Sequence, residues 1–211
     1  MIDSVNLREI GRATRLGQEL EALIVSRGQI TICCDRCPLL AAYWSLIFEH
    51  YKGVLCLLQN DYCAPAFALW RPMLEAMVRA CVTLKGSPSD VDKVRRDRYK
   101  MDFNKAGEQV AKALDAGPGD FDDLFKSAQS TLHSLTHSGM KQLRSRFDGK
   151  SIGANYPVGA ISSLVTSGAV SVSVVTLLAT KHLQFVAEET RATQLLSEYY
   201  SLSRQSSAPR L

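Results

Sequence analysis

Hydrophobic residues recur at steps of three and four along most of the chain, the spacing that gathers them on one face of an α-helix. The clearest such stretch is residues 39–58, which follows Pro38, and proline is favoured in the first turn of a helix. Residues 7–27 carry a narrower apolar stripe, residues 64–85 are apolar on nearly every side, and residues 121–136 have one apolar face. These patterns predict four helices.

Two further helices are predicted from longer and less regular patterns. Residues 91–114 are rich in Lys, Arg and Asp and are expected to form one helix, capped by Ser89 or Asp90. From Val158 to about Leu202, apolar residues again step by three and four, which favours one long C-terminal helix. Its many β-branched residues leave a strand as the alternative. We therefore expect an all-α bundle with a long C-terminal helix, forming a single domain over residues 1–211.

The stretch 151–180 has no charged side chain and is long enough to span a bilayer, for which ~20 apolar residues suffice. Serine, threonine and glycine dilute its hydropathy, which favours a buried helix of the bundle over a membrane span. Residues 1–15 carry charges where a secretory signal needs an apolar segment. We therefore expect a cytoplasmic protein, with membrane attachment as the alternative.

Composition and charge narrow the class of partner. The chain has 211 residues, 46% of them hydrophobic, and a net charge of +4. These values are typical of a globular protein with a real core, and the positive charge falls short of that expected for a dedicated duplex-DNA binder. Contact with an RNA or a nucleotide is compatible with this charge.

The cysteines are expected to be thiols in a reducing compartment. Cys34-Asp-Arg-Cys37, preceded by Cys33, has the spacing of half a zinc site, but no second Cys or His pair follows at a matching interval. A structural or incidental role is therefore the favoured interpretation, and we expect no metal and no cofactor. The other three cysteines lie among apolar residues and are typical of small core side chains: Cys56, Cys63 and Cys81.

Charged side chains are rare in the stretch 64–84, where only Arg71, Glu75 and Arg79 are charged. At ~100° per residue they share one narrow arc of the predicted helix. Charges on a buried helix must be paired or must face a cavity. An internal ion ladder that fixes helix register and a polar binding site are equally compatible with this pattern.

His133 and His137 lie four residues apart at the end of the predicted helix 121–136. No acidic residue lies between them, so this is not the zinc-protease pattern. A solvent-facing histidine is the simplest interpretation of His133. His137 is next to a Gly-terminated helix end, which faces open space, and is the stronger candidate for contact with a ligand.

Several short segments stand out together: His50, Asn60-Asp-Tyr62, Ala66 to Arg79, Leu135 to Gly139 and Ile152 to Tyr156. They resemble a group of uncharacterised bacterial helical proteins that are similar to the HEPN superfamily (higher eukaryotes and prokaryotes nucleotide-binding). The likeness covers about residues 39–156, with a HEPN-like core expected over about 39–202. The resemblance implies an up-and-down helical bundle, often a homodimer. It also implies a metal-independent ribonuclease or toxin in bacterial defence or toxin–antitoxin systems.

The chain departs from the HEPN ribonuclease pattern, in which an Arg precedes a His by four to six residues on one helix. No Arg lies four to six residues before His133 or His137. Either Arg71 supplies the cation from the neighbouring helix, or nuclease chemistry is lost. RNA cleavage through the 2′-OH needs a base, an acid and a cation near the phosphate. The expected catalytic residues are therefore His137 and Arg71, and the expected substrate-binding residues are Arg79, Glu75, His133 and Tyr156.

The alternative is a non-catalytic HEPN-like module that binds a nucleotide, an RNA or a protein partner, including a neutralising or activating protein. It predicts that the arc of Arg71, Glu75 and Arg79 is internally paired, with His137 free of catalytic neighbours. The ribonuclease hypothesis predicts instead that His137 and Arg71 converge on one cleft.

Overall fold

The computed structural model describes residues 2–28, 34–136, 143–147 and 156–206. The long helices of these residues are α1 (Ser4–Val25), α2 (Cys37–Gln59), α3 (Cys63–Lys85), α4 (Pro88–Arg95), α5 (Phe103–Leu114), α6 (Asp122–Thr136), α8 (Val158–His182) and α9 (Val186–Ser206). The predicted all-α class is confirmed. The helices expected near residues 7–27, 39–58, 64–85 and 121–136 are all present, with ends that differ by a few residues.

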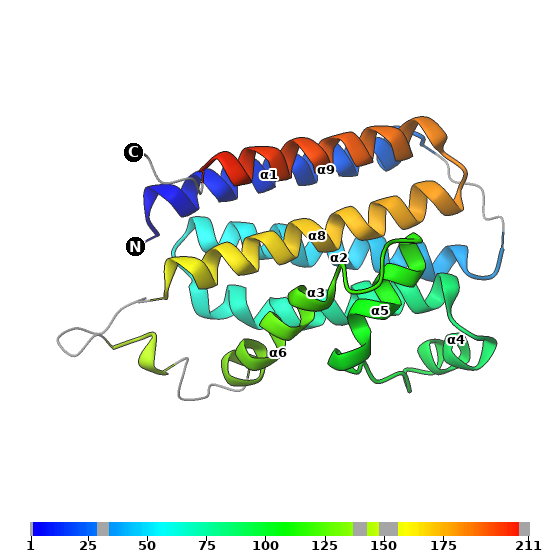
Figure 1. Ribbon diagram of the computed structural model, residues 1–211, viewed down its shortest axis with the longest axis horizontal. Helices are drawn as coiled ribbons and strands as arrows, with labels where there is room; N and C mark the ends of the chain where they lie inside the picture. The colour runs from blue at the N-terminus through cyan, green and yellow to red at the C-terminus, as the bar shows by residue number, and fades with distance from the viewer. Residues whose placement is uncertain (1, 29–33, 137–142, 148–155, 207–211) are drawn as a thin grey trace.

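Helix α8 occupies the middle of the bundle and packs against α1, α2, α3 and α9 (Figure 1). Helices α2 and α3 form an antiparallel pair, and α5 and α6 pack on α3. Helix α9 returns beside α1, so that the start of α1 and the end of α9 lie at the same end of the bundle (Figure 1). The buried hydrophobic side chains of these helices form one core cluster.

Tyr51 of α2 fixes the closest approach between three helices. Its ring lies between Gly17 of α1 and Gly168 of α8, where an added Cβ would come within 2.6 Å and 2.8 Å of ring carbons. The phenol oxygen donates a 2.6 Å hydrogen bond to the Ala13 carbonyl oxygen on α1. A side chain at either glycine would displace the ring, so both positions require glycine for this packing.

Five small polar residues of α8 are buried in the bundle: Ser167, Ser171, Ser173, Thr176 and Thr180. Ser171 and Ser173 are buried, and their hydroxyls donate to the carbonyls of Ser167 and Ala169 one turn earlier, at 2.8 and 2.7 Å. Because the helix itself satisfies these hydroxyls, the core can hold them without partners from other helices. In the described residues α8 is the one helix long and apolar enough to cross a membrane, and 72% of its most apolar stretch is buried. This burial agrees with the predicted core helix, and cytoplasmic localisation stays a prediction.

The prediction of one continuous helix from Val158 to about Leu202 is wrong, as is the strand alternative for the α8 segment. The chain leaves α8 through Gln184, which has a left-handed backbone with φ 58°. The amide of Phe185 donates to the Thr180 carbonyl at 2.8 Å, and the amide of Gln184 donates to Lys181 at 3.3 Å. This Schellman pattern ends a helix, usually with glycine at the left-handed position. Glutamine in that place explains why the sequence pattern hides the break.

The predicted helix over residues 91–114 is likewise two helices, α4 and α5. Asp97, with φ 52°, is the left-handed residue after α4, and the Arg98 amide donates to the Lys93 carbonyl at 2.7 Å. The connection to α5 then places Tyr99 in the core. The same non-glycine helix end hides this break in the sequence.

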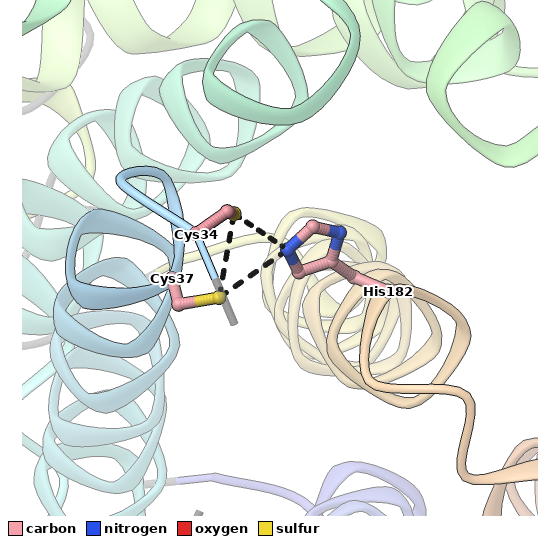
Figure 2. A group of neighbouring side chains, drawn as sticks. All are labelled: Cys34, Cys37 and His182. Atoms are coloured by element: carbon pink, nitrogen blue, oxygen red, sulfur yellow. Dashed lines mark hydrogen bonds between the residues drawn. The ribbon is translucent and has the colours of Figure 1, made fainter. Parts of the chain in front are cut away.

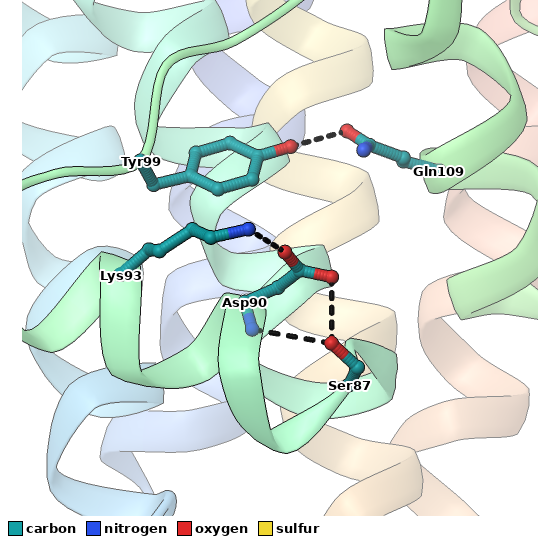
Figure 3. A network of polar contacts seen from close by, with 5 residues as sticks. All are labelled: Ser87, Asp90, Lys93, Tyr99 and Gln109. Atoms are coloured by element: carbon teal, nitrogen blue, oxygen red, sulfur yellow. Dashed lines mark hydrogen bonds and ion pairs between the residues drawn. The ribbon is translucent and has the colours of Figure 1, made fainter.

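Helix α4 is capped by Ser87 and not by the predicted Ser89 or Asp90. The Asp90 amide donates to the Ser87 hydroxyl, which in turn donates to the Asp90 carboxylate at 2.8 Å (Figure 3). Lys93 pairs with the same carboxylate at 2.8 Å. These bonds hold the Asp90 carboxyl in its charged form and lower its pKa.

We predict that Gly17→Ala and Gly168→Ala each lower stability by about 1–3 kcal/mol, the usual cost of overpacking a core. For a chain of this size the loss corresponds to roughly 2–4 °C of Tm per kcal/mol. Thermal unfolding followed by circular dichroism measures it. The matched controls are Gly11→Ala in α1 and Gly159→Ala in α8, where an added Cβ meets nothing within 4 Å. Equal Tm values for the tested and control variants would contradict the role of Tyr51.

We predict that stability falls at alkaline pH. Burial raises the pKa of the Cys81 thiol and of the Tyr200 phenol to about 12 each, and it raises the pKa of Tyr51 well above its usual value. The folded chain therefore keeps these protons to a higher pH than the unfolded chain does. Their stabilisation is therefore complete below the unfolded pKa values and is lost as the pH rises past about 9 for the thiol and about 10 for the phenols. Urea midpoints measured between about pH 8 and 11 test this, and a constant midpoint would exclude it.

Candidate functional site

Arg71 and Glu75, two of the predicted site residues, form an ion pair along α3. Arg71 Nε lies 2.8 Å from Glu75 Oε1, and the two side chains are 38% and 32% exposed. The Arg71 guanidinium also lies over the Phe103 ring, 5.9 Å from its centroid. Arg71 and Glu75 therefore face a surface beside α5 and are not enclosed in the core. Because both are partly exposed, their presence on α3 does not require a buried network of ion pairs.

Arg79, the third member of the arc, does not pair with Glu75. Its guanidinium donates to Asp97 at 2.7 Å and to the Tyr99 carbonyl at 3.2 Å. Partial burial works against its charge, but hydrogen bonds to Asp97 and Tyr43 raise the pKa of Arg79. The Arg79 side chain thus connects the α4–α5 segment to α3, and its guanidinium is already hydrogen-bonded within the protein.

The other predicted site residues are placed in part. Tyr156 stacks on Phe67 with ring centroids 5.1 Å apart. Phe67 is four residues before Arg71, so Tyr156 lies about one turn along α3 from the ion pair. His133 is on α6, but its side chain lies outside the described residues, as does all of His137. The described residues therefore bring Tyr156, Arg71 and Glu75 to one side of α3.

A run of cations borders this part of the surface. We call residues 93–105 the basic segment; its exposed cations are Lys93, Arg95, Arg96, Arg98, Lys100 and Lys105. Lys93 and Arg96 are paired with Asp90 and Asp92, and Arg95 donates to the Asp35 carbonyl. Among the described residues, the structure gives no carboxylate partner to the remaining three.

These three cations are presented outward by the local backbone. Arg98 and Lys100 flank the buried Tyr99, and both are exposed. Lys105 lies in the first turn of α5, two residues after Phe103, whose ring carries the Arg71 guanidinium. The basic segment therefore combines exposed cations with the half-buried ring of Phe103.

A second group of functional side chains gathers at the other site, formed by the start of α2 and the end of α8. Cys34 Sγ lies 3.5 Å from Cys37 Sγ, and His182 Nε2 lies 3.4 Å from each sulfur (Figure 2). All three donor atoms lie within 4.8 Å of one another, an arrangement that can hold a metal ion. Cys37 is buried, and Cys34 and His182 are partly buried. Cys33, which precedes them, lies outside the described residues.

The turn that carries the two cysteines is anchored by both of its intervening residues. Arg36 donates a 2.6 Å hydrogen bond to the Leu84 carbonyl at the end of α3. The carbonyl of Asp35 accepts from Arg95 of α4 at 3.2 Å. The Cys37 amide closes the turn on the Cys34 carbonyl at 3.1 Å. The positions of the sulfurs are therefore fixed by three elements.

An apolar pocket adjoins the Cys34–Cys37–His182 cluster. It has a volume of ≈ 340 Å³, and Cys37 and His182 are part of its lining. Most of its other lining side chains are apolar, including Leu40, Trp44 and Leu183. Donor atoms at the edge of an apolar hollow are a common arrangement for small-molecule sites.

His182 is the residue that sequence reasoning missed. It is separated from Cys34 and Cys37 by 148 and 145 residues, so no ligand spacing in the sequence marks it. The available signals were the Cys-x-x-Cys turn and a histidine at the last position of an apolar helix. Only the packing of α8 against α2 joins them.

Comparison with known proteins gives a family but no function. No curated protein and no solved structure matches the chain significantly. A family model does match, over residues 44–203, which is most of the chain. The match includes Arg71, Glu75 and His182 and begins after Cys34 and Cys37. The chain belongs to the family of unknown function DUF6988.

Proposed function

We propose that this protein is a HEPN-like helical module that binds RNA without cleaving it. The observation that carries the proposal is a set of exposed cations on the basic segment that have no carboxylate partner among the described residues: Arg98, Lys100 and Lys105. Cations of this kind attract the phosphate backbone of a nucleic acid, which supplies most of the affinity in non-specific binding.

An aromatic residue in the same segment supports the choice of single-stranded RNA. Phe103 is half-buried and already carries one guanidinium, that of Arg71, over its ring. Proteins that bind single strands combine a cationic track with aromatic rings on which bases stack. Phe103 and Tyr99 both lie in the basic segment. Because Tyr99 is buried, Phe103 is the proposed contact for a base.

The pairing of the charged arc favours binding over catalysis. Arg71 bonds to Glu75, and Arg79 is held by Asp97 and the Tyr99 carbonyl. A nuclease needs a cation poised at the scissile phosphate, and both arginines have carboxylate partners instead. The non-catalytic hypothesis predicted internal pairing of the arc; Arg71 and Glu75 follow it, whereas Arg79 pairs with Asp97 outside the arc.

The second candidate is a metal-independent ribonuclease, acting as a homodimeric toxin or defence protein. One observation favours it: the Arg71 side chain is 38% exposed, so a phosphate can compete with Glu75 for it. In this candidate His137 would act as base or acid and Arg71 would stabilise the phosphate. The two candidates share the bound polymer and differ in whether it is cut.

We predict that Lys100→Glu and Lys105→Glu each weaken RNA binding by about tenfold, the equivalent of about 1.4 kcal/mol. Fluorescence anisotropy of a labelled single-stranded RNA at fixed salt measures the Kd. Arg8→Glu is the matched control, because it reverses an exposed charge on α1, far from α4 and α5 in the bundle (Figure 1). Equal losses in all three variants would point to net charge alone and would overturn the assignment to this segment.

We predict that total RNA and tRNA stay intact when incubated with the purified protein in the presence of a metal chelator. The His137→Ala and Arg71→Ala variants should give the same intact RNA on denaturing gels. Cleavage by the wild type that disappears in both variants would replace the binding proposal with the ribonuclease. Cleavage that persists in both would identify a contaminating nuclease, since the variants share the purification.

A further inference from the structure

We propose that Cys34, Cys37 and His182 bind a zinc ion. This site goes beyond the proposed RNA binding and uses none of its residues. Zinc prefers thiolate and imidazole ligands in a tetrahedral arrangement, and two cysteines with one histidine make up a common donor set. The two cysteines come from one turn and the histidine from the end of another helix, so the fold and not the local sequence assembles the site.

The distances between the donor atoms match the edges of a zinc tetrahedron. With Zn–S near 2.3 Å and Zn–N near 2.0–2.1 Å, tetrahedral geometry separates two sulfurs by about 3.8 Å and a sulfur from a nitrogen by about 3.5 Å. The corresponding separations here are 3.5 Å for Cys34 to Cys37 and 3.4 Å for each cysteine to His182. An ion can be placed between the donors with shifts of a few tenths of an ångström.

Two other arrangements of the same residues fit less well. A disulfide requires sulfurs about 2.05 Å apart, well below the 3.5 Å between Cys34 and Cys37. A set of weak thiol hydrogen bonds accounts for single contacts but gives no reason for three donor atoms to point at one another. Figure 2 shows the imidazole edge directed between the two sulfurs, the orientation that a shared ion requires.

The surroundings hold the ligands in place before a metal binds. Asp35 and Arg36 anchor the cysteine turn to α4 and α3 through the bonds with Arg95 and Leu84. The end of α8 is fixed by Lys181, which pairs with Asp115 at 2.5 Å. Ligands that are already positioned lose little conformational entropy on binding, so the site is expected to bind the ion tightly.

The described residues offer three donors, which leaves a fourth position on a tetrahedral ion. Structural zinc sites fill all four positions with protein ligands, whereas sites that bind water or a substrate keep one open. The apolar pocket lined by Cys37 and His182 adjoins this donor set. With these three described ligands, the fourth position of the ion is left for water or for another ligand.

The test uses cobalt as a spectroscopic probe for zinc in the reduced, metal-free full chain. We expect one equivalent of Co²⁺ to give thiolate-to-metal charge-transfer absorption and the strong visible bands of a tetrahedral ion, and Zn²⁺ to abolish both. Loss of an outer partner of a ligand weakens metal binding by about 10–100-fold. Cys34→Ser and His182→Gln, which alter ligands themselves, are therefore expected to weaken it by about a hundredfold or more.

Matched controls separate loss of a ligand from general damage. Cys56→Ser changes an exposed thiol of α2, and His50→Gln changes a histidine of the same helix; both should bind cobalt like the wild type. Zinc should raise the Tm of the wild type and of the controls but not of the ligand variants. The proposal is overturned if reduced wild-type protein shows no charge-transfer band. It is also overturned if Cys34→Ser and His182→Gln titrate like the controls.

Discussion

The seating of Tyr51 between Gly17 and Gly168 is the contact on which the rest of the bundle depends. It brings α1, α2 and α8 to a separation that no larger side chain at those glycines would permit. It also sets the register of α2 against α8, which run in opposite directions (Figure 1). Cys37 lies fourteen residues before Tyr51, and His182 lies fourteen residues after Gly168. Equal lengths of helix, about 21 Å each, therefore carry Cys37 and His182 to the same end of the bundle.

The cysteine–histidine cluster and the basic segment are linked by hydrogen bonds at this end of the bundle. Arg95 of α4 bonds to the Asp35 carbonyl between the two cysteines, and Arg36 bonds to the last turn of α3. Arg79 holds the connection that follows α4. The cationic surface is thus supported by ordinary backbone and side-chain hydrogen bonds from two directions. Several charged side chains thus stabilise the fold. The exposed cations that have no carboxylate partner among the described residues are available to a binding partner.

Much of the fold is predictable from the sequence because the period of the apolar residues is strong. The two breaks that were missed, after α4 and after α8, share one cause: Asp97 and Gln184 adopt the left-handed backbone that glycine usually occupies. Residue type gives little warning of such a helix end, because tertiary packing decides it. The burial of α8 was predicted from the serine and glycine content of its apolar stretch, and its packing between other helices bears this out.

Some features of the two sites follow from local sequence spacing, whereas others depend on contacts between distant segments. The shared face of Arg71 and Glu75 follows from their spacing of four and was predictable. The partner of Arg79 was not, since Asp97 reaches it only because α4 ends where it does. The third ligand of the cysteine cluster was hidden by a separation of 145 residues or more. Periodicity reports which face a residue occupies, whereas contacts between distant segments depend on register and helix ends.

The claim that exposed cations of the basic segment bind an RNA backbone has one direct physical signature. Each neutralised phosphate of a single strand contributes a slope of about −0.7 to the plot of log affinity against log salt concentration. Three cations, Arg98, Lys100 and Lys105, therefore predict a slope of about −2 for the wild-type protein and a single-stranded RNA. A slope close to zero, or no measurable binding at low salt, would contradict the account.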